Sequence, residues 1–245
     1  MKLKVLGSSS RGNCYLLESD DSVLAIEAGI PFREVKQALG WDISRLSACI
    51  VSHRHGDHAA HVKDFVSAGV TVFALPDVFT HAGMKNRVCC KEVWPGKGYR
   101  IGRWSIIPIN VVHDVPCVGY IIEHPEMGRT VFVTDTMMLE YRIPRVSHYM
   151  VECNYADDVL QRNIDNGSVL PMMRERLHGT HMELETTKGI IAGADRSCLE
   201  NVVLIHLSDG NSDEKRFVAE IEAVCGVPTY AADKGMEIDF SLLPF

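Results

Sequence analysis

The chain has 245 residues, of which 46% are apolar and 23% are charged, a balance typical of globular proteins. Its formal net charge of −7 argues against a broad basic face that would hold long nucleic acid by its phosphates. No apolar run is long enough for a membrane-spanning helix, and the start of the chain does not resemble a secretion signal, so we expect a cytoplasmic protein.

The apolar patterns, taken in chain order, predict strands with helices between them. In the first half we expect strands at 2–6, 14–19, 22–26, 46–52 and 70–75, and helices at 31–40 and 59–69. In the second half we expect strands at 103–112, 117–124, 130–135, 148–154, 201–208 and 227–233, mostly helix over 155–195, and an amphipathic helix over 212–226. No repeat or linker interrupts the pattern, so one domain over 1–245 is predicted, an α/β (α+β) fold of two packed sheets flanked by helices.

Residues 52–58 read SHRHGDH, directly after the predicted buried strand 46–52. Imidazole nitrogens and carboxylate oxygens are good ligands for divalent metals. On an extended loop His53 and His55 can face one metal, whereas Asp57 and His58, where the chain turns into a helix, can face a second. His61 lies one helical turn beyond His58 and is interpreted as a supporting or surface residue. The eight cysteines contain no C-x-x-C pair, so no thiolate zinc site is expected.

Two metals need more ligands than this loop provides, and polar residues at the ends of other apolar strands are the candidates. His113 ends INVVH, Asp135 ends TVFVTD, and His206 ends VVLIH. A single strand-end residue of this kind is more often structural, but three of them together indicate a shared site.

These motifs resemble the metallo-β-lactamase superfamily, whose fold is a four-layered αββα sandwich. The resemblance extends over nearly the whole chain and is most specific at H-x-H-x-D-H. It implies that a first metal is bound by His53, His55 and His113, and a second by Asp57, His58 and His206. Asp135 would bridge the two ions. Zinc, manganese and iron all accept such ligands, and zinc or manganese is expected.

A narrower resemblance is to the YycJ (WalJ) branch, which is similar to the ribonuclease Z and J nucleases. It is based on GSSSRGNCYLLES, EAG, SHRHGDH, VVHDVPCVGY, VTDT, VECN and HLSDGN. In THMELET, His181 matches a histidine that such nucleases carry before the last metal ligand; the alternative is a helix-cap histidine. The chain departs from the usual Asp-Ala-Gly, because it has Glu27, whose extra methylene is expected to shift a hydrogen bond to a metal ligand.

The resemblance implies a phosphodiester hydrolase in which a hydroxide bridging two metals attacks phosphorus. Asp57 would also orient the hydroxide, and His181 would stabilise the phosphoryl oxygens or protonate the leaving group. The substrate class is nucleic acid or a nucleotide, and DNA, RNA and a cyclic or other small nucleotide remain open. No membrane partner is expected, and a homodimer is left open.

Several alternatives accompany this interpretation. The same metals could activate water against a carbonyl in a lactone, thioester or β-lactam, or the site could serve binding alone. GSSSRGN could contact an anion or form a tight turn, and Asn211 could touch substrate or cap the next helix. Two basic clusters could contact phosphates or be ordinary surface: Lys85, Arg87 and Lys91, and Arg100 and Arg103.

Overall fold

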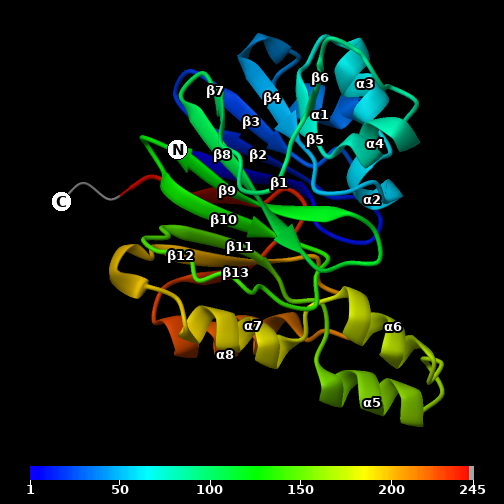
Figure 1. Cartoon of the computed structure of the whole chain (residues 1–245). Coiled ribbons are helices and arrows are strands. Elements are labelled where there is room, and N and C mark those ends of the chain that lie inside the picture. The colour runs from blue at the N-terminus through cyan, green and yellow to red at the C-terminus, as the bar shows by residue number, and fades with distance from the viewer. Residues whose placement is uncertain (243–245) are drawn as a thin grey trace.

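A computed structural model describes residues 1–242, in which two seven-stranded sheets pack face to face and helices cover both outer faces (Figure 1). In spatial order the first sheet contains β14 (Glu237–Asp239), β1 (Lys2–Gly7), β2 (Cys14–Glu18), β3 (Val23–Ile26), β4 (Leu46–Ile50), β5 (Val72–Ala74) and β6 (Cys90–Glu92). Its outer face packs against α1 (Phe32–Ala38), α2 (Gly56–Ala59), α3 (Val62–Ser67) and α4 (Pro76–His81).

The second sheet contains β13 (Thr229–Ala231), β12 (Asn201–Ile205), β11 (His148–Glu152), β10 (Gly128–Val133), β9 (Cys117–His124), β8 (Trp104–Val111) and β7 (Tyr99–Ile101). The helices that follow its later strands are α5 (Asp157–Asp165), α6 (Met173–Thr180), α7 (Leu184–Ala192) and α8 (Glu214–Cys225). Of these, α7 and α8 pack on the outer face of the sheet. The layers are therefore helix, sheet, sheet and helix, which confirms the predicted αββα architecture.

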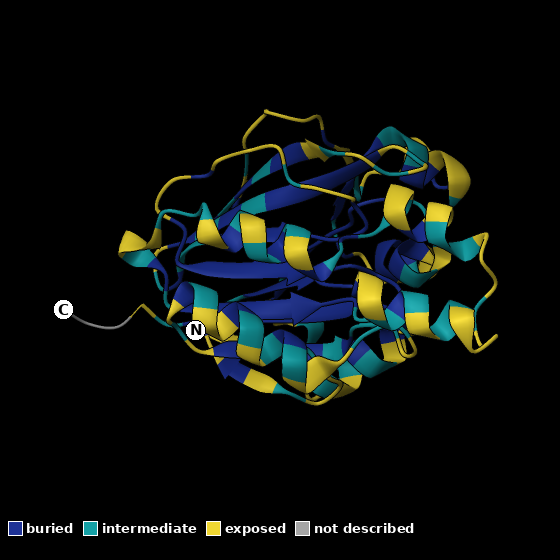
Figure 2. Cartoon of the chain, turned by 90° about the horizontal axis from the view of Figure 1, so that it is seen from below, coloured by how far each residue is buried: buried dark blue, intermediate teal, exposed yellow. Residues whose placement is uncertain are grey.

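The alternation of side chains along each strand explains the layering. In β2, Tyr15 and Leu17 point into the core between the sheets, whereas Cys14 and Leu16 pack against the helices. Strands that are buried on both faces must be apolar throughout, and in Figure 2 the sheets form a buried layer between helices whose outer faces are exposed. Within residues 1–242, no helix combines the length and the apolar character that crossing a bilayer would require.

The helix predicted over 59–69 was wrong as one continuous element. It is divided into α2 and α3, because the backbone of Ala28 bonds to the chain at the break. Ala28 N–H donates to the His58 carbonyl (2.8 Å), and the Ala28 carbonyl accepts from His61 N–H (2.9 Å). The short elements α4, β6, β7 and β14 were not predicted, since three to six residues give little periodic signal.

The directions of the strands determine where the site forms. Strands β10, β11 and β12 are parallel neighbours, so their carboxyl ends lie at one edge of the second sheet. Strand β8 is antiparallel to β9, which is antiparallel to β10, so β8 ends at the same edge. The residues that follow these strands therefore meet beside the loop after β4.

Candidate metal centre

The histidine-rich loop leaves β4 and enters the short helix α2. His53 and His58 are buried, whereas the side chains of His55 and Asp57 are partly exposed. The loop is held by a close backbone approach, in which Asn13 N–H donates to the Asp57 carbonyl (2.7 Å). A Cβ atom at Gly29 would lie 1.8 Å from that carbonyl oxygen, so this position requires glycine.

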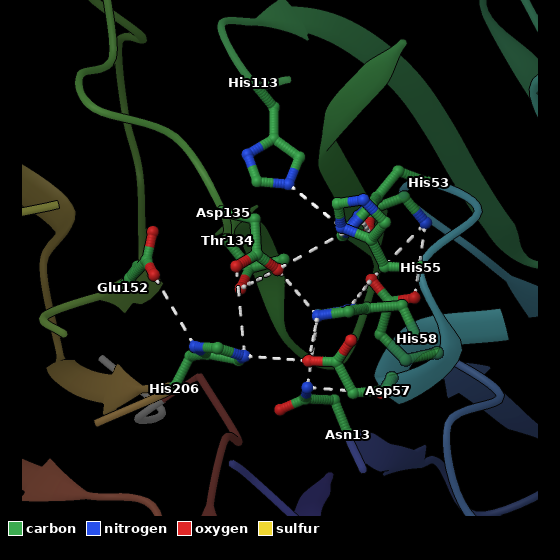
Figure 3. A network of polar contacts seen from close by, with 12 residues as sticks. Asn13, His53, His55, Asp57, His58, His113, Thr134, Asp135, Glu152 and His206 are labelled. Atoms are coloured by element: carbon green, nitrogen blue, oxygen red, sulfur yellow. Dashed lines mark hydrogen bonds and ion pairs between the residues drawn. The ribbon is translucent and has the colours of Figure 1, made fainter. Parts of the chain in front are cut away.

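Three imidazole rings converge on one side of the loop (Figure 3). His53 Nε2 lies 3.1 Å from His55 Nδ1, and His113 Nε2 lies 3.2 Å from the same atom. Burial and the neighbouring His58 hold the pKa of His53 well below its usual value, so this ring is neutral. Neutral ring nitrogens that point at one another are the donor set that a divalent cation accepts.

A second group lies beside the first and includes a carboxylate. Asp57 Oδ2 lies 3.2 Å from His58 Nε2 and 3.2 Å from His206 Nε2. Burial raises the pKa of Asp57, but the hydrogen bonds from His206 and His58 lower it by more. The resulting pKa is well below the usual value. Asp57 is therefore an ionised carboxylate, the form in which it can bind a metal.

Asp135 is buried between the two groups. Its Oδ2 lies 2.6 Å from His58 Nε2 and 3.8 Å from His53 Nε2, and its Oδ1 lies 3.8 Å from His206 Nε2. One carboxylate thus faces both donor sets. The structure brings together all seven of the predicted metal ligands.

Three of the six non-glycine residues that have a positive φ within residues 1–242 lie at the centre or beside it. Glu27, Asp135 and His206 have φ values of 68°, 48° and 55°, in the left-handed region that non-glycine residues seldom adopt. Each of them follows the end of a strand. Strained residues of this kind persist where the surrounding structure fixes them, and they are characteristic of functional sites.

The ring nitrogens that point away from the centre lie close to polar groups, which would fix the orientation of each ring. These contacts are Ser52 Oγ to His53 Nδ1 (2.9 Å), Asp114 Oδ1 to His55 Nε2 (3.5 Å), Glu27 Oε1 to His58 Nδ1 (3.5 Å), the Thr180 carbonyl to His113 Nδ1 (3.2 Å) and Glu152 Oε1 to His206 Nδ1 (3.6 Å).

Two features test whether the residues present fit divalent cations. In the first group His53 Nε2 and His113 Nε2 both face His55 Nδ1, and Asp114 Oδ1 lies 3.1 Å from His113 Nε2. In the second group Asp57 Oδ2 likewise faces both His58 Nε2 and His206 Nε2. Within each group of three residues, His53, His55 and His113 or Asp57, His58 and His206, the candidate ligand atoms lie within 4.8 Å of one another. The residues present are therefore compatible with binding divalent metals.

His181 lies directly after α6, at the edge of the centre. Its Nδ1 is 2.7 Å from Glu152 Oε1 and 3.1 Å from Asp135 Oδ1, and its ring stacks on that of His206. The side chain therefore contacts the centre, while the backbone of His181 forms the C-cap of α6, with its N–H donating to the Leu177 carbonyl (2.9 Å). Glu152 is the residue that sequence reasoning missed as part of the site. Its position at the end of an apolar strand is the same signal that identified Asp135 and His206.

The flanking loops have structural contacts of their own. Ser8 Oγ accepts from His206 N–H (3.0 Å), and Asn13 Nδ2 lies 3.1 Å from His58 Nε2, so GSSSRGN braces the second donor group. The alternative that Asn211 caps the next helix was wrong, because Asp213 caps α8 by accepting from Arg216 N–H. The His61 side chain bonds to the neighbouring Asp64 carboxylate (2.9 Å) and lies outside the centre.

Comparison with known proteins places this geometry in a family. The model of the Metallo-beta-lactamase superfamily matches residues 9–141. A relative from Streptococcus pneumoniae serotype 2 (strain D39 / NCTC 7466), the exodeoxyribonuclease WalJ, is 23% identical over 261 residues, covering 98% of this chain and 93% of that protein. This relative belongs to the branch that the sequence motifs resemble.

Solved structures agree in fold. The metallo-beta-lactamase fold protein YhfI from Bacillus subtilis superposes with a TM-score of 0.75 at 18% identity, covering 97% of this chain and 99% of that one. Zn²⁺-bound PqqB from Methylobacterium extorquens gives a TM-score of 0.72 at 16% identity, covering 98% and 100%. From the matched family model, the sandwich and the donor groups at its edge, we conclude that the chain belongs to the metallo-β-lactamase superfamily.

Proposed function

We propose that the chain is a dinuclear metal-dependent phosphodiester hydrolase that acts on nucleic acid or nucleotides. The observation that carries this proposal is the placement of Asp135, whose single buried carboxylate contacts both donor groups. The similarity to an exodeoxyribonuclease supports phosphodiesters over carbonyl substrates.

In this proposal His53, His55 and His113 hold one ion, Asp57, His58 and His206 hold the other, and Asp135 contacts both. Zinc or manganese suits the ligands, and iron accepts the same donors. The Zn²⁺-bound structural relative favours zinc. Bound divalent cations would supply an acidified water and neutralise charge on the phosphate oxygens.

The chain itself supplies groups for orientation and proton transfer. Asp57 has a partly exposed carboxylate beside the donor groups and can orient the attacking water. The Glu152 carboxylate accepts a hydrogen bond from His181 Nδ1 and so fixes the plane of the imidazole ring. The ring, held in this way and still partly exposed, can donate a proton to the leaving oxygen or contact the phosphoryl oxygens.

The rim of the centre favours a substrate with accessible bases. Basic side chains near the donor groups are already paired, as Arg11 is with Asp209 (3.0 Å) and Arg54 with Asp77 (2.9 Å). In contrast, Val112, next to His113, and Met138, three residues after Asp135, are exposed and apolar. Exposed apolar groups at a site indicate contact with apolar parts of a ligand. A single-stranded end or a nucleotide suits this rim better than a long duplex held by its phosphates.

The test is a hydrolysis assay of the zinc- or manganese-loaded protein on single- and double-stranded DNA, RNA, cyclic nucleotides, a generic phosphodiester, a lactone and a thioester. The variants are His55→Ala and, as a matched control, His61→Ala from the same loop but outside the centre. We expect chelator-sensitive cleavage of phosphodiesters that is lost in His55→Ala and kept in His61→Ala. Turnover of the lactone or thioester alone would contradict the proposal.

A further inference from the structure

A second cavity, of about 570 Å³, lies at the end of the second sheet opposite the metal centre. Ser105, at the start of β8, lines it, whereas His113 follows the end of the same strand. An eight-residue strand spans roughly 25 Å, so the cavity is separate from the centre. Arg100 and Arg103, one of the two basic clusters seen in the sequence, line this cavity.

The floor of the cavity is a row of polar side chains that crosses adjacent strands. Strand register pairs Arg100 with Ser105, Ser105 with Glu123, and Glu123 with Arg129. The row continues to Ser147, whose N–H donates to the Arg129 carbonyl (2.7 Å). Since Trp104 and Ile106, the neighbours of Ser105 in β8, point into the core between the sheets, the row faces outward.

The cavity is rich in guanidinium groups, although the chain as a whole is acidic. Four arginines and two glutamates line it: Arg100, Arg103, Arg129, Arg145, Glu123 and Glu200. Arg129 is paired with Glu123 (2.6 Å), and Arg103 with Glu126 (3.1 Å). Arg100 and Arg145 form no ion pair among residues 1–242, so two guanidinium groups are available to an anion.

A buried polar side chain also lies in the wall of the cavity. Ser147 is buried, and Gly128 leaves its hydroxyl uncovered, because a Cβ at Gly128 would lie 2.5 Å from Ser147 Oγ. His124 borders the cavity as well, but its ring points to the other face of β9, where it packs on Trp104 with ring centroids 4.4 Å apart.

We propose that this cavity binds a small phosphorylated molecule of about the size of a mononucleotide. A planar guanidinium matches two phosphate oxygens at once, and a hydroxyl donor such as Ser147 can satisfy a third. The cavity volume falls within the range of small-molecule sites. Pro125 and Leu242 provide an apolar wall for the rest of the ligand. The proposal does not depend on the reaction at the metal centre.

The experiment is isothermal titration calorimetry on the full chain after treatment with chelator, which removes cations that would themselves bind phosphate. The probes are dAMP, inorganic phosphate and deoxyadenosine, which has no phosphate. The first variant is Arg145→Lys, which keeps the positive charge but loses the planar guanidinium that donates two parallel hydrogen bonds. The second is the double variant Arg100→Ala/Arg145→Ala. Arg87→Ala, an exposed arginine outside the cavity, is the matched control. Circular dichroism verifies that each variant is folded.

We expect dAMP to bind the wild-type chain, deoxyadenosine not to bind, and the double variant to lose about 10- to 100-fold in affinity. Arg145→Lys should also weaken binding, and Arg87→Ala should leave it unchanged. Tighter binding of dAMP than of phosphate would identify a phosphorylated organic molecule, and equal affinities would identify phosphate itself; both support the site. No binding of either probe at millimolar concentration, or equal affinities in wild type and double variant, would overturn it.

Discussion

At the scale of single residues, Glu27 connects the strand end after β3 to the metal centre. Its carboxylate accepts from Ser52 N–H (3.3 Å) and lies 3.5 Å from His58 Nδ1. The extra methylene of Glu27 is expected to shift its hydrogen bond to a metal ligand, and the contact with His58 is long. We predict that Glu27→Ala weakens zinc binding by about 10- to 100-fold, because His58 loses the group that orients its ring.

Competition with a chromophoric chelator measures this affinity. Glu34→Ala, which removes a partly exposed carboxylate paired with Lys234, is the control and should leave zinc binding unchanged. Equal zinc affinity in Glu27→Ala and wild type would show that His58 does not depend on Glu27.

A second residue-scale prediction concerns His124. Burial lowers the pKa of His124 below its ordinary value of 6.5. The negative charges of Glu126 and Asp21 oppose this shift, whereas the positive charge of Arg103 adds to it. Since the unfolded chain takes up the proton first, the stability that neutral His124 contributes is present above pH 6.5 and is lost as the pH falls below it. Urea unfolding at pH 7 and pH 5.5 should therefore show a smaller loss of stability in His124→Gln than in wild type.

Other histidines also titrate in this window, so the informative quantity is the difference between variant and wild type. The exposed His81→Gln is the control, and it should reproduce the wild-type pH dependence. The same dependence in His124→Gln would refute the assignment.

At the scale of elements, α2 is held by the approach of Gly29 to the backbone at Asp57. We predict that Gly29→Ala displaces the first turn of α2, because its Cβ would lie 1.8 Å from the Asp57 carbonyl oxygen. Both zinc binding and the thermal midpoint should fall. Gly56→Ala, within α2 itself, has no atom within 4 Å of its added Cβ and should bind zinc as wild type does. Equal zinc affinity in the two variants would contradict this account.

The elements also show how far the sequence alone was informative. Apolar runs such as 46–52 predicted buried strands, and residues at strand ends predicted which side chains lie together at the candidate metal centre, because both signals are local. The break between α2 and α3 depends on Ala28, about 30 residues away in sequence, and no local pattern contains it. Glu152 was visible at a strand end, but its contact with His181 arises only because the chain after α6 returns to the end of β11.

At the scale of the whole molecule, the metal centre joins the two sheets. His53, His55, Asp57 and His58 follow β4 of the first sheet, whereas His113, Asp135 and His206 follow strands of the second. Ions bound only by the folded state stabilise it by about 2.7 kcal/mol at a free concentration of 100 times the dissociation constant. For a chain of this length we predict that zinc raises the thermal midpoint by roughly 5 to 10 °C.

Differential scanning calorimetry with zinc and with chelator measures this shift. His55→Ala should lose most of the shift, and His61→Ala should keep it. A zinc-dependent midpoint that is the same in both variants would place the bound ion elsewhere in the chain.

The order of the ligands along the chain also has a consequence for synthesis on the ribosome. The first triad is complete once His113 has emerged, but the second requires His206, which follows β12. Strand β1 must likewise wait for its neighbour β14, at residues 237–239. Because domains fold as the nascent chain emerges from its N-terminal side, the early loop of four ligands is exposed before its partners exist. In the proposed dinuclear protein, full metal loading would therefore be a late event in biogenesis, because the two sheets can pack completely only when nearly all of the chain has been made.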